Sequence, residues 1–127
     1  MEKRFYLGVI ILALLLTICI GVAIVMTVIH QNVEKDLEDA AQLALANDLD
    51  GALPIAQRAY DRWETFHSVT ASFADHSPMD DTDTLFQEML VYGQTGELPH
   101  FAACCRELTV MTEAMYDAHV FSLKNLL

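Results

Sequence analysis

The chain has 127 residues, 54% of them hydrophobic, and 18 acidic against 7 basic side chains give it a formal net charge of −11. A surface with this excess of acid repels phosphate backbones, so the composition excludes nucleic acid as a partner. Cys104 and Cys105 are adjacent on an expected helix, where an internal bridge would be distorted, so no disulfide framework is expected.

The first element is an apolar run from Phe5 to Ile29 that contains no charged side chain. As an α-helix this run would be roughly 37 Å long, which exceeds the ~30 Å hydrocarbon core of a bilayer. We therefore expect a transmembrane helix over residues 5–29 that anchors the chain in the lipid bilayer. A cleaved signal peptide is the alternative, because Gly21-Val22-Ala23 loosely fits a cleavage site. The apolar residues that continue from Ile24 favour the uncleaved anchor.

The charges on either side of this run predict its orientation. Lys3 and Arg4 precede it, whereas Lys35 stands among acidic residues in the segment that follows. Basic residues beside a span remain on the cytoplasmic side. We expect residues 1–4 to form a cytoplasmic tail and residues 30–127 to form the extracytoplasmic domain of a single-pass cell-membrane protein.

Ala13, Thr17 and Gly21 recur at every fourth position of the apolar run and so share one helix face. Small residues with this spacing let two helices approach closely in lipid. This face predicts self-association or a membrane-protein partner. Small residues are also common in transmembrane helices that have no such role.

Apolar residues continue at three- and four-residue spacing beyond the apolar run, so one long helix is expected to extend as far as Asn47. A second helix is expected after the turn residues that follow, with Asp50 as its cap and Pro54 in its first turn. Its apolar face continues up to His76. No strand pattern competes with these helices.

A third helix is expected after Ser77-Pro78, with Asp80, Asp81 and Asp83 crowding its start, where acids complement the helix dipole. The fourth helix should follow Gly96 and end before His119. The residues expected to be buried in one core share helical spacing: Trp63, Phe66, Phe73, Leu85, Phe86, Leu90, Phe101, Cys105 and Leu108.

The predicted fold is therefore all-α, with the transmembrane helix continuing into a small bundle of two antiparallel helical hairpins, like those of tetratricopeptide repeats. An internal similarity supports the two hairpins. A shift of 45 residues places the sequence Gly-Ala-Leu-Pro at 51–54 on Gly-Glu-Leu-Pro at 96–99. Each tetrapeptide would open the second helix of a hairpin.

No catalytic or phosphate-binding motif is present, so neither enzymatic activity nor a cofactor is expected. Asp75, His76 and His119 are the candidate metal ligands, because parallel second and fourth helices would bring the two histidines to the same end of the bundle. Imidazole ligands suit zinc, copper or nickel. Capping or exposed histidines are the alternative interpretation. Tyr60 and Trp63, about one helical turn apart, line either the core or a groove between the hairpins.

The chain resembles the bacterial family called domain of unknown function 4363 over nearly its whole length. The resemblance rests on the N-terminal anchor, the acidic stem, Trp63, the Phe73-Ala74-Asp75-His76 stretch and the Ser122 to Leu127 ending. It implies a small single-anchor protein of Gram-positive bacteria with a helical outer domain. Some members are encoded beside a second membrane protein, which implies a protein partner. The stretch from Gly93 to Tyr116 is less charged than the family pattern.

We expect a non-enzymatic interaction or accessory module that serves another envelope protein through Ala13, Thr17 and Gly21, or through a groove at Tyr60 and Trp63. The alternative is an extracytoplasmic metal-binding domain that uses Asp75, His76 and His119.

Overall fold

The computed structural model describes residues 2–70 and 76–126, with side chains described for residues 2–68 and 80–117. This part of the chain forms four α-helices: α1 (Glu2–Leu45), α2 (Leu49–Thr70), α3 (His76–Gln94) and α4 (Leu98–Leu126). It contains no strand, so the all-α prediction is confirmed.

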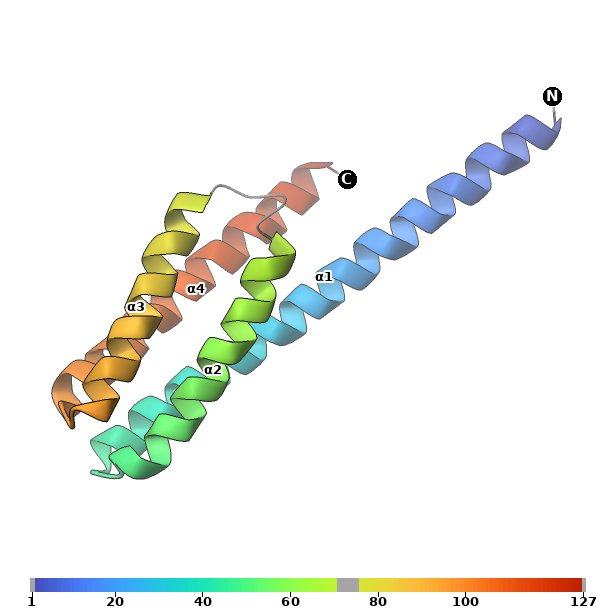
Figure 1. The fold of residues 1–127 in the computed structure, drawn as a ribbon. Coiled ribbons are helices and arrows are strands. Elements are labelled where there is room, and N and C mark those ends of the chain that lie inside the picture. Colours follow the sequence, from blue (N-terminus) through green and yellow to red (C-terminus); the bar gives the residue numbers. More distant parts are fainter. Residues whose placement is uncertain (1, 71–75, 127) are drawn as a thin grey trace.

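The helices alternate in direction, and α1 and α2 form one antiparallel hairpin while α3 and α4 form another (Figure 1). α2 packs against α3, and α4 packs back against α1. Each helix thus has two neighbours. The N-terminal half of α1 projects beyond the bundle as a separate rod (Figure 1).

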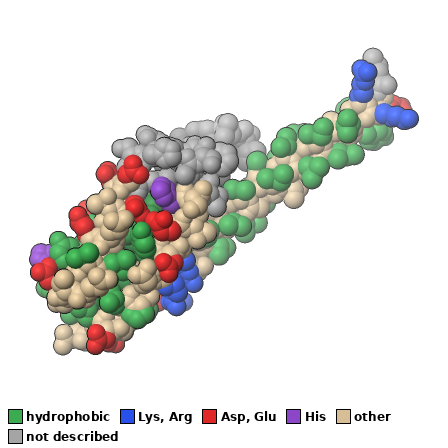
Figure 2. All heavy atoms as spheres, viewed as in Figure 1, with side chains coloured by type: hydrophobic (Ala, Val, Ile, Leu, Met, Phe, Trp, Pro, Cys, Tyr) green, Lys and Arg blue, Asp and Glu red, His purple; other side chains and the backbone are tan. Residues whose placement is uncertain are grey.

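α1 is unbroken over 44 residues, about 66 Å at the usual helical rise, and it confirms the expected continuation of the apolar run into the domain. It is the one helix in the described ranges that is long and apolar enough to cross a membrane. Hydrophobic side chains cover the projecting rod, with Lys and Arg at its far end (Figure 2). Leu12 and Ile24 are each 59% exposed, whereas Leu37 is fully buried. One helix therefore has an uncovered apolar half and a half that belongs to the core.

The two turns between paired helices have the same geometry. Asn47 and Gly96 adopt positive φ angles of 64° and 75°. The Asp48 amide donates to the Leu43 carbonyl at 2.8 Å, and the Glu97 amide donates to the carbonyl five residues earlier at 2.9 Å. These bonds define Schellman-type ends, in which a left-handed residue satisfies the last carbonyls of a helix.

The helix boundaries differ from the predictions in three places. Asp48, and not Asp50, caps α2, because its Oδ1 accepts the Gly51 amide at 3.0 Å. Pro54 therefore lies beyond the first turn and withholds a hydrogen bond from the Asp50 carbonyl inside the helix.

The other two boundaries concern α3 and α4. α3 begins at His76, so Ser77 and Pro78 lie in its first turn, where a proline leaves no intrahelical bond unmade. α4 does not stop before His119 but continues to Leu126.

The core lies between the four helices. Six of the predicted core residues are buried: Trp63, Phe66, Phe86, Phe101, Cys105 and Leu108. Leu85 and Leu90 are partly buried against this cluster, and Phe73 lies outside the described residues. The face assignments of the helices that the sequence predicted therefore hold for the described core.

Equivalent positions of the two hairpins are 49 residues apart in the sequence, so the predicted shift of 45 residues is wrong. Gly51 lies inside α2, whereas Gly96 precedes α4, so the two tetrapeptides are not structurally equivalent. The shift of 49 superposes Asn47 on Gly96. It also pairs eight buried positions of the first hairpin with eight of the second: Val33, Leu37, Ala40, Ala44, Ala52, Ala56, Ala59 and Trp63 fall on Thr82, Phe86, Met89, Gly93, Phe101, Cys105, Leu108 and Thr112.

Candidate functional site

The two aromatic residues predicted for a core or a groove belong to the core side of α2. Trp63 is 2% exposed, and its indole ring lies 5.4 Å from the Phe66 ring and 5.8 Å from the Phe86 ring. Tyr60 is half-buried, with its ring 5.7 Å from Phe86. Burial raises the pKa of the Tyr60 phenol. Trp63 is therefore not available to a partner as a groove residue, and Tyr60 only in part.

The small residues of the rod remain accessible. Ala13, Thr17 and Gly21 are all exposed, and no other part of the chain lies within 4 Å of where a Gly21 side chain would begin. Thr17 Oγ1 donates to the Ala13 carbonyl at 2.8 Å, so the hydroxyl is satisfied within its own helix. At about 100° per residue, this face lies roughly opposite the side on which Leu37 and Ala40 enter the core. A second helix can approach Ala13 and Thr17 without meeting the bundle, whereas Gly21 also lines the space between α1 and Phe66 of α2.

The proposed metal ligands cannot be placed from the described side chains. Asp75 lies outside the described residues; the backbones of His76 and His119 begin α3 and lie within α4, but their side chains are also outside the described part. Among the side chains that are described, no three His, Cys, Asp or Glu residues form a group suited to a metal ion.

The described histidines stack on aromatic rings. His67 stacks on Trp63 with ring centroids 6.2 Å apart, and exposed His100 stacks on Tyr92 at 5.1 Å. The third, His30, is buried and stacks on Tyr116, as described below.

An ion pair with a buried carboxylate, which the sequence analysis did not identify, joins α1 to α2. The Asp36 side chain is 3% exposed and accepts from two arginines of α2. Arg58 donates through Nη2 to Oδ1 at 2.8 Å and through Nε to Oδ2 at 3.2 Å, and Arg62 Nη1 donates to Oδ2 at 2.7 Å. Hydrogen bonding to Asp36 raises the pKa of Arg58. The available signal was an acid adjoining the apolar stripe of α1 and two arginines four residues apart on α2.

A second polar contact joins α1 to α4. The His30 imidazole stacks on the Tyr116 ring at 4.4 Å, and Thr27 Oγ1 lies 2.9 Å from the Tyr116 hydroxyl. His30 is 8% exposed, and burial lowers its pKa, although Glu34 and the nearby carboxylates of α4 act in the opposite direction. The neutral imidazole is thus the form that this site favours.

The adjacent cysteines are packing residues. Burial raises the pKa of Cys105 to about 12, and it also raises the pKa of Cys104. The Cys105 thiol lies 3.4 Å from Met89 Sδ inside the core. A thiol that stays protonated is a poor nucleophile and a poor metal ligand.

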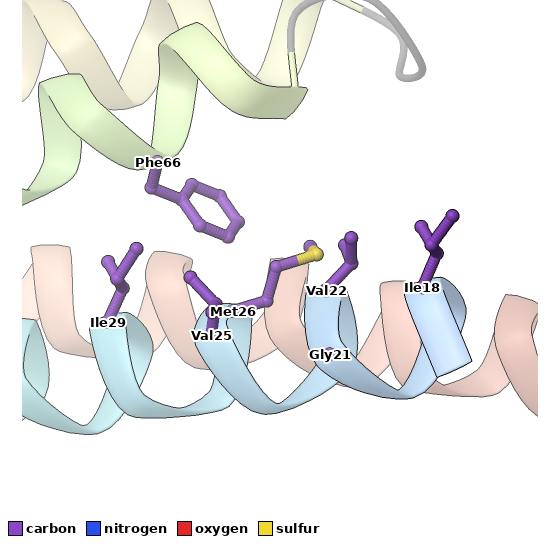
Figure 3. A pocket seen from close by; sticks show the side chains of 7 residues that line it. All are labelled: Ile18, Gly21, Val22, Val25, Met26, Ile29 and Phe66. Atoms are coloured by element: carbon purple, nitrogen blue, oxygen red, sulfur yellow. The ribbon is translucent and has the colours of Figure 1, made fainter. Parts of the chain in front are cut away.

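An apolar pocket of about 370 Å³ lies where the rod meets the bundle (Figure 3). Phe66 points from α2 toward the side chains of Met26 and Val22 on α1 (Figure 3). All its described lining residues are apolar: Ile18, Gly21, Val22, Val25, Met26, Ile29 and Phe66. Such a lining has no described polar group to orient a polar ligand.

No family model, curated protein or solved structure matches this chain. The geometry defines a four-helix bundle built on an apolar helix that extends beyond it. The resemblance to domain of unknown function 4363 stays a prediction.

We predict that Asp36→Ala lowers the free energy of unfolding by about 2 kcal/mol, because it removes charge-assisted hydrogen bonds from a buried acceptor. Denaturant unfolding of the full-length chain in mild detergent measures the change. Glu38→Ala, an exposed acid on the same helix, is the control and should change stability by less than about 0.5 kcal/mol. Equal effects of the two substitutions would show that the ion pair does not stabilise the bundle.

We also predict that acid destabilises the α1–α4 contact. Because the folded-state pKa of His30 lies below 6.5, the unfolded chain binds the proton more tightly, and stability is lost as pH falls through 6.5 toward the folded value. Thermal unfolding followed by circular dichroism between about pH 7.5 and about pH 5.5 tests this in the range where histidine titrates. His30→Phe keeps a stacking ring and should weaken the pH dependence, whereas His100→Phe should preserve it. An unchanged slope in His30→Phe would refute the assignment.

Proposed function

We propose that this protein is a non-enzymatic accessory module of the cell membrane, anchored by α1, with the bundle on the extracytoplasmic side. It binds another membrane protein, or a second copy of itself, through the face of α1 that carries Ala13, Thr17 and Gly21. The observation that carries the proposal is the apolar, uncovered N-terminal half of α1, continuous with the helix that builds the core.

Exposure of the rod supports a membrane environment. Large apolar side chains from Phe5 to Val28 are 42–70% exposed where they are not packed on the bundle. Apolar surface left in water costs roughly 25 cal/mol per Å². Lipid or an apolar partner removes that cost, and a length of 25 apolar residues matches a bilayer span.

The charge distribution supports the orientation. Lys3 and Arg4 lie at the far end of the rod, and acidic side chains gather on the bundle (Figure 2). Basic residues beside a span favour the cytoplasmic side, and acidic residues affect orientation little.

The character of the rod supports a partner that is itself a helix. Its small-residue face is exposed and carries no unsatisfied hydroxyl, since Thr17 bonds to Ala13. Close packing at small residues is a main source of helix association in lipid. Trp63, the alternative contact residue, is occupied inside the core.

Topology is the first test. Protease added to intact protoplasts should digest a tag placed after Leu127 and spare a tag placed before Glu2, because the basic residues hold the N-terminus in the cytoplasm. Immunoblotting of both tags, before and after detergent lysis, measures protection. A protected C-terminal tag would place the bundle in the cytoplasm and contradict the proposal.

The partner is tested by photocrosslinking in native membranes. A photoreactive residue at Thr17 should give a discrete protein adduct, because this face is the one proposed to pack on another helix. Leu15 lies about 200° around the same helix and serves as the matched control, with little or no such adduct expected. Mass spectrometry identifies the adduct. Equal crosslinking from both positions, or none from Thr17, would contradict a specific helix partner.

A further inference from the structure

The relative positions of α1 and α4 determine how far the bundle stands from a membrane. The two helices run antiparallel (Figure 1). Tyr116 of α4 contacts Thr27 and His30 of α1. α4 continues for ten residues beyond Tyr116, to Leu126, which adds about 15 Å in the direction of the rod. The end of α4 is therefore level with roughly Thr17 of α1.

The rod that remains beyond the end of α4 is too short to cross a bilayer. From Glu2 to Thr17 it measures about 22 Å at the helical rise, against ~30 Å for the hydrocarbon core. If α1 crosses the membrane, the end of the bundle that faces the rod must enter the adjacent leaflet. This step rests on the proposed membrane anchoring.

The composition of that end fits such an environment. The described backbone at this end consists of residues 69–70 of α2, 76–79 of α3 and 118–126 of α4. These 15 residues include one Asp, Glu, Lys or Arg residue, Lys124, whereas such residues make up 20% of the whole chain. The cost of placing this end in the leaflet is correspondingly low.

The apolar pocket lies at the same level. A hydrocarbon core that begins at Phe5 and needs about 20 helical residues ends near Ile24. Three residues of the pocket lie within this hydrocarbon core: Ile18, Gly21 and Val22. Three others lie just outside it, on the side of the bundle: Val25, Met26 and Ile29. The pocket is thus placed where acyl chains meet the headgroup region.

We propose that this pocket binds an acyl chain of a lipid from the leaflet that adjoins the bundle. The described lining is entirely apolar and offers no partner to a water molecule or to a headgroup. Its volume of about 370 Å³ lies within the range of small-ligand sites. Of the small-residue face only Gly21 also lines the pocket, so a helix packed at Ala13 and Thr17 leaves the rest of the pocket open, and hydrocarbon is the occupant that its lining and depth favour.

The test is photocrosslinking of the full-length chain in nanodiscs of phosphatidylglycerol and phosphatidylethanolamine. Benzoylphenylalanine replaces Phe66, which points toward Met26 and Val22. Lipid adducts, identified by mass, are expected from Phe66 and also from the mid-span position Ile11. No lipid adduct is expected from Val91, an exposed apolar residue of α3.

Matched glycine variants test whether the pocket itself holds the lipid. Gly21 and Gly8 both belong to α1, and beyond the adjoining residues and backbone of that helix no atom lies within 4 Å of a Cβ added at either, but only Gly21 lines the pocket. Gly21→Leu should fill the pocket and abolish the Phe66 lipid adduct, whereas Gly8→Leu should leave it unchanged. Circular dichroism of both variants checks that the helices persist.

The outcomes separate this inference from the proposed function. Lipid adducts at Ile11 but not at Phe66, or a Phe66 adduct that survives Gly21→Leu, would overturn the lipid site and leave the anchor intact. A protein adduct at Phe66 would replace the lipid with a partner. No lipid adduct at either position, with the chain extracted from membranes by alkaline carbonate, would refute the anchor as well.

Discussion

The structure depends on one constraint: a single uninterrupted helix must combine an apolar half that the bundle leaves uncovered with a half that builds the core. The N-terminal half of α1 presents apolar side chains on all sides, and its C-terminal half presents an apolar stripe to α2 and α4 and acids to water. No proline interrupts this helix between Glu2 and Leu45. If α1 spans a membrane as proposed, its internal hydrogen bonds satisfy the backbone in lipid. The same helix continues into the bundle, where every other helix is positioned relative to α1 directly or through one neighbour.

Small side chains and polar contacts have different tasks between α1 and its neighbours. The buried faces of α1 and α2 are rich in alanine, which permits close approach but distinguishes poorly between alternative registers: Ala40, Ala41, Ala44, Ala52, Ala56 and Ala59. The ion pair of Asp36 with Arg58 and Arg62 forms in only one register of α1 against α2. A shift by one helical turn would leave the buried carboxylate without its arginine partners. The stacking of His30 on Tyr116 has the same role between α1 and α4.

The features that periodicity controls could be predicted from the sequence: the all-α fold, the continuity of α1, the four helices, and the inward faces of Trp63, Phe101 and Cys105. The features that depend on tertiary context could not. Matching residue letters aligned Gly51 with Gly96, but what the hairpins share is a left-handed turn residue, which is Asn in one and Gly in the other. The pairing of Asp36 across helices has no local signal, because any of the many acids on α1 and α2 could have remained in water.

If α1 spans a membrane as proposed, its unbroken continuity also couples the bundle to the thickness of the bilayer. A helix whose apolar stretch is longer than the local hydrocarbon layer tilts to bury it. A flexible linker after the span would absorb that tilt, but here the helix passes directly into the core through Val33 and Leu37. In that proposed setting, a change in lipid composition that thins the bilayer would tilt the whole bundle together with α1 and change the direction in which its acidic surfaces face.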